Sequence, residues 1–183
     1  LLFDQTTLGS TNKLSSFDYN RSDDGTLLLG NVLETDTYNH HQGIVNSAAG
    51  SIMVNTSSHF ISGSFIDNNG TGINTFQGTT LIEPSFVFNP TQSGLALSGT
   101  VTNNGVFSKD GTGITNFIGN TQLNGSSAFN FLNGNLLVND GAVVVNQSTH
   151  TDEGIYVVGA LTGAGSSAQW QNMGKLSYYN ASA

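Results

Sequence analysis

Carboxylates are the residues of this chain best suited to catalysis, because two of them at the right separation can hydrolyse a glycosidic bond. Glycosidases hold their two carboxyl groups roughly 5 to 10 Å apart. Asp110 and Asp152 stand at near-equivalent places of an internal repeat described below, which would put them about 10 Å apart if two strand spacings separate them. A shared preference for acids in turns produces the same coincidence. We therefore expect no catalytic residues and a protein that is not an enzyme.

Acidic turns are the candidates for a metal site, because calcium prefers clustered carboxylate and carbonyl oxygens. Four stretches qualify: Asp23-Asp24-Gly25, Asp67-Asn68-Asn69-Gly70, Lys109-Asp110-Gly111 and Thr151-Asp152-Glu153-Gly154. None has the EF-hand pattern or the nonapeptide of calcium-binding β-rolls. We interpret them as turns in which Asp or Asn bonds to its own backbone. Asp152, Glu153 and Asp110 are the positions at which a calcium contact would form, and we expect no other cofactor.

Histidines and aromatic residues supply two further candidate sites. His40, His41 and His59 could bind a transition metal, but their spacing fits no standard site and we expect solvated histidines in loops. Aromatic faces stack on sugars, so Trp170, Tyr178 and Tyr179 could form a carbohydrate platform. Trp170 and Tyr178 also stand at apolar places of the repeat, which makes the core the alternative location for them.

Composition excludes several classes of partner. The 183 residues carry 12 acids against 4 Lys and Arg, a formal net charge of -8, so we expect neither nucleic acid nor an anionic membrane surface as a partner. Charged residues make up only 9% of the chain, and its hydrophilicity comes from amides and hydroxyls. The absence of cysteine excludes disulfides and thiolate chemistry. No apolar run is long enough for a membrane span.

The elements that position these side chains are predicted to be short strands. Runs of β-branched and aromatic residues are bounded by Gly, Asn, Asp or Ser throughout the chain, whereas helical spacing is nearly absent. A degenerate repeat of about forty residues places Gly72-Ile73, Gly113-Ile114 and Gly154-Ile155 at matching positions. The repeat indicates one continuous body of stacked coils.

A parallel, right-handed β-helix or solenoid of about twenty residues per coil is the fold class that the repeat favours, with an antiparallel β-sandwich as the alternative. About eight coils would make a rod of roughly 40 Å. We expect Ile73, Ile114 and Ile155 to stack in the core, and a second set to do so as well: Val54, Leu97, Val138 and Tyr178. Residues 1–43 hold half of the acids and are predicted to be an irregular cap or first coil, followed by solenoid repeats over 44–183.

A recurring phrase of an apolar or aromatic residue, Asn, Gly and a short strand carries a family resemblance. It is found at three places: Val101 to Phe107, Phe131 to Asn139 and Trp170 to Leu176. The phrase resembles the β-solenoid repeats of secreted bacterial surface proteins, such as autotransporter passengers, filamentous-haemagglutinin-like adhesins and repetitive Bacteroidetes surface proteins. This resemblance implies an exported protein at the bacterial cell surface that serves adhesion or surface assembly.

The expected function is therefore a structural stalk or adhesin module that is extracellular and non-catalytic. Its partners would be a glycan or protein ligand on an extracellular surface, or other copies of a surface assembly. Two alternatives remain open. One is a β-helix carbohydrate-active enzyme or tailspike-like depolymerase, which a cluster of acids or bases on adjacent coils would favour. The other is a fibre subunit with a sandwich fold that polymerises by adding strands at its edges.

Overall fold

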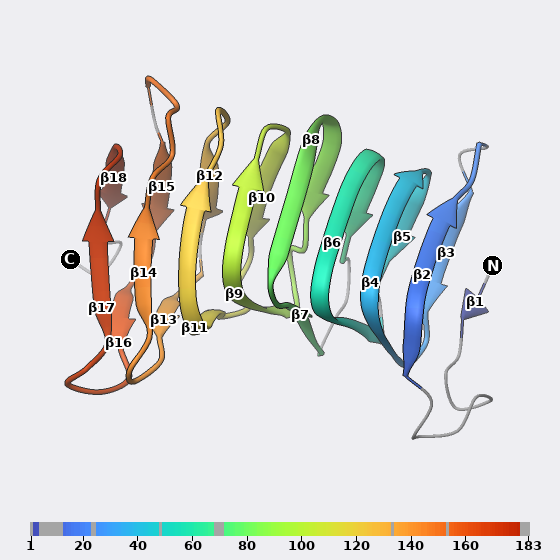
Figure 1. The fold of residues 1–183 in the computed structure, drawn as a ribbon, viewed down its shortest axis with the longest axis horizontal. Coiled ribbons are helices and arrows are strands. Elements are labelled where there is room, and N and C mark those ends of the chain that lie inside the picture. The colour runs from blue at the N-terminus through green and yellow to red at the C-terminus, as the bar shows by residue number, and fades with distance from the viewer. Residues whose placement is uncertain are drawn as a thin grey trace.

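The described part of the chain is a stack of parallel β-coils. The computed structural model describes residues 2–3, 13–22, 25–47, 49–67, 72–132, 134–152 and 154–179, and these ranges contain strands and no helix. About seven coils of about 21 residues each lie side by side along the long axis (Figure 1). Every strand pairing in the described residues is parallel. The β-solenoid prediction is confirmed and the antiparallel sandwich is wrong, while a fibre subunit that polymerises by adding strands stays a prediction.

Each coil contributes a strand segment to three faces, which the pairing registers define. The first face holds β7 (Ile73–Phe76), β13 (Leu136–Val138) and β16 (Leu161–Gly163). The second face holds β2 (Leu14–Asn20), β14 (Val143–Asn146) and β17 (Gln169–Asn172). The third face holds β1 (Leu2–Phe3), β3 (Thr26–Leu29), β5 (Ile44–Asn46), β10 (Val106–Asp110), β12 (Phe129–Leu132), β15 (Ile155–Val158) and β18 (Leu176–Tyr179).

The remaining strands are long and bend from one face to the next. From the first face to the second run β4 (Val32–Gln42), β9 (Gly94–Asn103) and β11 (Thr115–Asn124). From the second face to the third runs β8 (Thr79–Asn89), and β6 (Ser51–Ile66) contributes to all three faces. β2 and β4 pair in the same ladder as the later coils, so both strands are part of the stack. The predicted boundary between residues 43 and 44 stays a prediction.

Columns of inward-facing side chains form the core, because alternate residues of each strand point into the coil and register partners stack. One column on the first face consists of Thr35, Val54, Phe76, Leu97, Phe117 and Val138. All six side chains are buried. The predicted stacking of Val54, Leu97 and Val138 is therefore confirmed, with phenylalanines occupying the coils between them.

An aromatic column runs along the third face. Its register partners are Leu27, Val45, Phe65, Phe88, Phe107, Phe129, Ile155 and Leu176. The rings of Phe65 and Phe88 stack with centroids 5.4 Å apart, and those of Phe88 and Phe107 with centroids 5.2 Å apart. These separations are close to the roughly 4.8 Å between neighbouring strands, so the backbone ladder itself brings the rings into contact.

The predicted core stack of three isoleucines is wrong. Ile73 and Ile114 point outward from the first face and are 60% and 49% exposed. Ile155 is buried, but it belongs to the third face, where it pairs with Phe129. The sequence repeat and the structural repeat differ because the later coils are longer: Leu136 pairs with Leu161, whereas Leu95 pairs with Thr115.

Tyr178 was also assigned to the wrong column. It pairs with Val157 on the third face, and the position that follows Val138 on the first face is Gly163. The reason is the same extra length: Val138 and Gly163 are 25 residues apart, whereas Val157 and Tyr178 are 21 apart, so residues after about position 140 are displaced relative to the sequence repeat.

Stacked glycines form the corner between the first and second faces. Gly78 and Gly99 both have left-handed φ angles, of 75° and 87°. A Cβ at Gly78 would lie 2.0 Å from the oxygen of Thr56, and one at Gly99 would lie 2.1 Å from the oxygen of Gly78. Only glycine fits this corner, because both the backbone angle and the adjacent coil exclude a side chain.

Candidate functional site

The register separates the acids that the sequence repeat had aligned. Asp110 is exposed at the end of β10, where it pairs with Leu132. Asp152 is exposed in the loop before β15, and the first residue of that strand, Ile155, pairs through Phe129 with Phe107. Asp110 therefore lies at the carboxyl ends of the third-face strands and Asp152 near their amino ends. The two acids do not occupy equivalent positions of the coil, so they do not form the carboxylate pair that the sequence repeat suggested.

The loop that contains Asp152 is organised by a histidine. The His150 Nδ1 atom accepts hydrogen bonds from the backbone N–H of Asp152, at 3.3 Å, and from that of Gly154, at 3.5 Å. Glu153 lies outside the described residues. Within the described part of the chain, no group of three or more His, Asp or Glu residues is arranged to hold a metal ion. The calcium contact predicted for Asp152, Glu153 and Asp110 stays a prediction.

His40 is a core residue of a strand and not a solvated loop residue, which corrects the expectation from the sequence. Its Nε2 atom lies 3.0 Å from the carbonyl oxygen of Gly43, so this nitrogen donates and Nδ1 accepts from the Tyr38 hydroxyl at 2.9 Å. Burial lowers the pKa of His40 to about 4, and burial raises the pKa of the Tyr38 hydroxyl. The pair is therefore neutral near pH 7 and forms a hydrogen-bonded pair inside the core.

Two histidine–carboxylate pairs lie on the outer side of the second face. His59, in β6, contacts the Glu83 carboxylate of the next coil at 2.9 Å. His41 lies 3.7 Å from Asp18, whose pKa is lowered chiefly by a hydrogen bond from the Asn39 side chain. Both histidines lie in strands, not in loops. Each pair joins adjacent coils, and a link of this kind between half-exposed groups stabilises the stack only modestly.

A buried polar cluster occupies the corner between the third and first faces. Asn74 donates to the Ser47 and Ser93 hydroxyls, at 3.2 and 2.7 Å, and accepts from the Ile52 N–H at 3.1 Å. The Asp67 carboxylate accepts from the Ser93 N–H. The Lys109 side chain is buried in the same corner. Asp67 thus bonds the backbone of the next coil at this corner, whereas the sequence interpretation expected a bond to its own turn.

Lys109 adds a cation to this corner. Its ammonium donates to the Thr91 carbonyl at 2.9 Å, and the side chain is buried. Burial lowers the pKa of Lys109, while the charges of Asp67 and Asp110 act in the opposite direction. A buried ammonium held by a backbone carbonyl fixes the path of the chain where it turns between faces.

Trp170 and Tyr178 lie on different faces of the stack and do not form one platform. Trp170 is half-buried on the second face and meets Phe117 edge to face, with centroids 5.8 Å apart. Its Nε1–H is buried without a hydrogen-bond partner. Tyr178 is 43% exposed on the third face, because no further described coil covers it. The side chain of Tyr179 lies outside the described residues.

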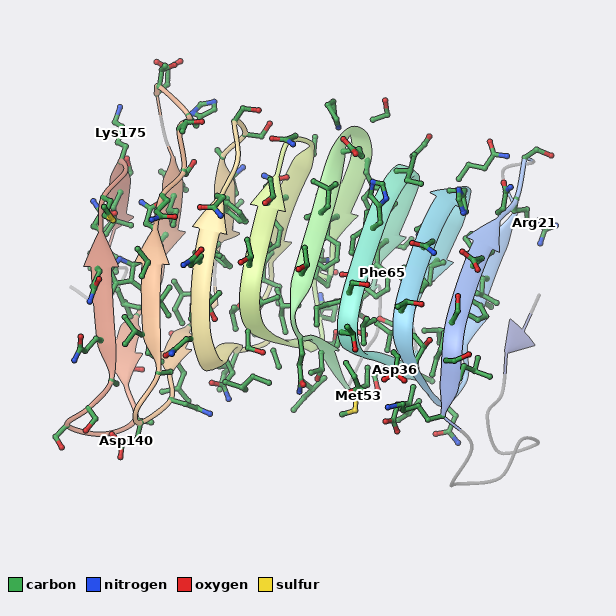
Figure 2. All side chains as sticks on the ribbon, viewed as in Figure 1. Arg21, Asp36, Met53, Phe65, Asp140 and Lys175 are labelled. Carbon is green, nitrogen blue, oxygen red and sulfur yellow. The ribbon has the colours of Figure 1, made fainter. Side chains whose placement is uncertain are left out.

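An apolar groove lies on the outer side of the first face and is here called the first-face groove. It encloses about 820 Å³. Ile73 and Ile114 form one wall, with Gly94 between them in the register. The floor is a column of outward positions in successive coils: Met53, Thr75, Ala96, Asn116 and Leu137. Figure 2 shows Met53 projecting from the stack below β6, at one end of this column.

The shape of the groove follows from side-chain size. Thr75, Ala96 and Asn116 are small or medium-sized, while Met53 and Leu137 at the two ends are longer. None of the lining side chains is charged. The Oδ1 atom of Asn116 is buried and has no hydrogen-bond partner. The groove is thus an uncharged trough that crosses the strands and contains one unsatisfied acceptor.

No protein-family model matches the chain, and no curated protein or solved structure is significantly similar to it. The described residues include no helix that is both long enough and apolar enough to cross a membrane.

Sequence reasoning missed the first-face groove because it placed Ile73 and Ile114 in the core. The available signal was the pair Asn74 and Thr115, one residue later in each copy. Both are buried, and so are Phe76 and Phe117 two residues further along each strand. Because side chains alternate along a strand, burial of Asn74 and Thr115 turns both isoleucines outward.

Proposed function

We propose that this chain is a non-catalytic structural rod, a stalk or adhesin module of an extracellular or bacterial cell-surface protein. The observation that carries the proposal is the unbroken ladder of the second face, in which β2, β4, β6, β8, β9, β11, β14 and β17 pair in succession. A solenoid of this kind extends by repetition, and its length is set by the number of its coils.

The outward side chains of the second face support a role in contact with water and polar ligands. One outward column consists of Ser16, Thr37, Ser57, Thr79, Thr100, Gln122, Val145 and Gln171. Seven of these eight residues carry a hydroxyl or an amide. Such a surface is hydrated without a high charge density, and it offers hydrogen-bond groups to a glycan or protein partner.

The location is tested by immunogold electron microscopy of intact producing cells with an antibody against this chain. We expect gold particles on the outer surface. Gold confined to the cell interior would overturn the proposal. A second assay measures the release of reducing ends from a panel of polysaccharides incubated with the purified chain. Release above the level of heat-denatured protein would overturn its non-catalytic part.

The structural role is tested by removing one coil in register. Val145 pairs with Gln171, so deletion of 146–171 joins two equivalent positions and keeps the first-face groove. The control deletes only 146–158, about half a coil, which breaks the register. We expect cells that produce the full-coil deletion to adhere to polystyrene under flow within about twofold of the parent, and cells with the half-coil deletion to lose most adhesion. Equal adhesion of all three would contradict a role of this segment in attachment.

A further inference from the structure

We propose that the first-face groove binds a short, uncharged, extended peptide segment with aliphatic side chains. The inference goes beyond the rod function and stands apart from it, because a rod without a ligand in this groove would still be a rod. Four properties of the groove support it: the lack of charge, the exposed apolar walls, the polar groups among them, and the dimensions.

The first property is charge. All side chains that line the groove are uncharged, on a chain whose formal net charge is -8. The nearest carboxylate in the register, Glu34, lies one coil beyond Met53 and accepts a hydrogen bond from Asn55 at 3.1 Å. A charged ligand would lose hydration in the groove without gaining a partner, so the complementary ligand is uncharged.

The exposed apolar walls indicate that the ligand carries aliphatic groups. Ile73 and Ile114 are 60% and 49% exposed, and Val32 beside them is 42% exposed. Covering such side chains with aliphatic groups removes apolar surface from water and so favours binding.

The polar groups distinguish a peptide from an acyl chain. Asn116, Gln77 and Thr75 line the same groove, and the Asn116 Oδ1 atom has no hydrogen-bond donor. An acyl chain would cover the Thr75 and Gln77 side chains without pairing with them, and it would leave the Asn116 oxygen, which is already buried, without a donor. A peptide supplies backbone N–H and C=O groups, and a half-turn of the Asn116 amide would present its oxygen to a ligand N–H.

The dimensions distinguish a peptide from a second copy of the chain. Met53 and Leu137 are four register steps apart, which is roughly 19 Å at the strand spacing. Ile73 and Gln77, on opposite sides of the floor, are four residues apart, or roughly 13 Å. The footprint of roughly 250 Å² is about a third of the 800 Å² per partner in a standard protein interface. A strand of about six residues spans the same length.

The experiment is a titration of the full chain, labelled at isoleucine δ1 methyl groups, with a capped six-residue peptide of alternating valine and threonine. We expect saturable NMR shifts at Ile73 and Ile114 and none at Ile155, which is buried in the third face. Ile73→Asn should weaken binding at least tenfold. The matched variant Val106→Asn, at a position 50% exposed on the third face, should bind like the parent. Saturable shifts at Ile73 and Ile114, weakened by Ile73→Asn and unchanged by Val106→Asn, support the proposal. Weaker binding of a peptide with glutamate in place of threonine supports the uncharged character of the site.

Three outcomes would overturn the proposal. One is the absence of saturable shifts up to about 1 mM peptide, which corresponds to a binding free energy weaker than about -4 kcal/mol. Another is binding of octyl glucoside, below its micelle concentration, at the same isoleucines and more tightly than the peptide, which would identify an alkyl-chain site. The third is a change of the Ile73 and Ile114 shifts with protein concentration in the absence of peptide, which would identify a second copy as the occupant. Each result leaves the rod proposal to its own tests.

Discussion

Phe88 stacks on Phe107 with ring centroids 5.2 Å apart and ring planes inclined by 18°. The two residues are direct register partners in adjacent coils, and both are about 1% exposed. The contact therefore joins the backbone ladder to the core: the spacing of the strands sets the spacing of the rings. The same relationship extends to Phe65 on one side and, with tilted rings, to Phe129 on the other.

We expect Phe88→Ala to lower the free energy of unfolding by about 3 to 5 kcal/mol, because it removes a ring that contacts both neighbouring coils and leaves a cavity. Val87→Ala is the matched control, since Val87 is the adjacent residue and is 40% exposed. It should cost less than about 1 kcal/mol. Urea unfolding followed by circular dichroism measures both. Similar losses for the two variants would mean that the aromatic column does not hold the coils together.

Two glycines separate the cost of a left-handed backbone from the cost of crowding between coils. Gly78 and Gly141 have φ angles of 75° and 77°, but a Cβ would meet the Thr56 oxygen at 2.0 Å in the first case and no atom within 4 Å in the second. We expect Gly141→Ala to cost about 1 to 2 kcal/mol for the backbone angle alone. Gly78→Ala should cost roughly 3 kcal/mol or more, since a backbone atom must also move. Equal destabilisation in thermal unfolding would show that the coils do not press together at this corner.

The His40 side chain predicts a loss of stability in mild acid. Its pKa falls from about 6.5 in the unfolded chain to about 4 in the core, so the unfolded state binds more protons between these values. The neutral His40 side chain contributes fully to the free energy of unfolding above pH 6.5, and this contribution decreases as the pH falls toward 4. Its loss should reach about 2 kcal/mol at pH 5 and about 3 kcal/mol at pH 4.

The measurement is the free energy of unfolding at pH 7.5 and pH 5 for the parent and for His40→Gln. The ionisable groups around His40 are Tyr38, Tyr19 and His41, of which His41 opposes its protonation. They are retained in the variant, so subtraction isolates His40. We expect the parent to lose about 2 kcal/mol more than the variant over this range. Parallel pH dependences for the two proteins would place His40 in contact with water.

The sequence was sufficient for the fold class because short strands, turn residues and an internal repeat agree with one another. It also placed Val54, Leu97 and Val138 in one column, since each is an apolar residue at the same place of a short strand in its copy of the repeat. It failed at Ile73 and Ile114 because hydrophobicity alone assigned the core side of the strand. Asn74 takes the inward position there, and it is stabilised by hydrogen bonds to Ser47 and Ser93 from neighbouring coils. Those partners are far apart in the sequence, so no local pattern indicates them.

The candidate sites depended on register even more strongly. A forty-residue period aligned Asp110 with Asp152, yet additional residues in the later coils place them toward opposite ends of one face. His40 carries no local sign of burial, because its neighbours His41 and Gln42 are polar and its hydrogen-bond acceptor is a backbone carbonyl. The first-face groove exists only when the six coils that line it are stacked in the correct register.

The most direct test of the stacked rod measures distances between spin labels along one column. Ser16, Thr79 and Gln171 are exposed outward positions of the second face, and the chain has no cysteine, so pairs of cysteines introduced there are labelled selectively. Gln171 is four register steps from Thr79 and seven from Ser16. By double electron–electron resonance we expect separations of about 19 and 34 Å, an increase of roughly 4.8 Å for each coil. Separations that fail to increase with the number of intervening coils would contradict the solenoid, and with it the rod.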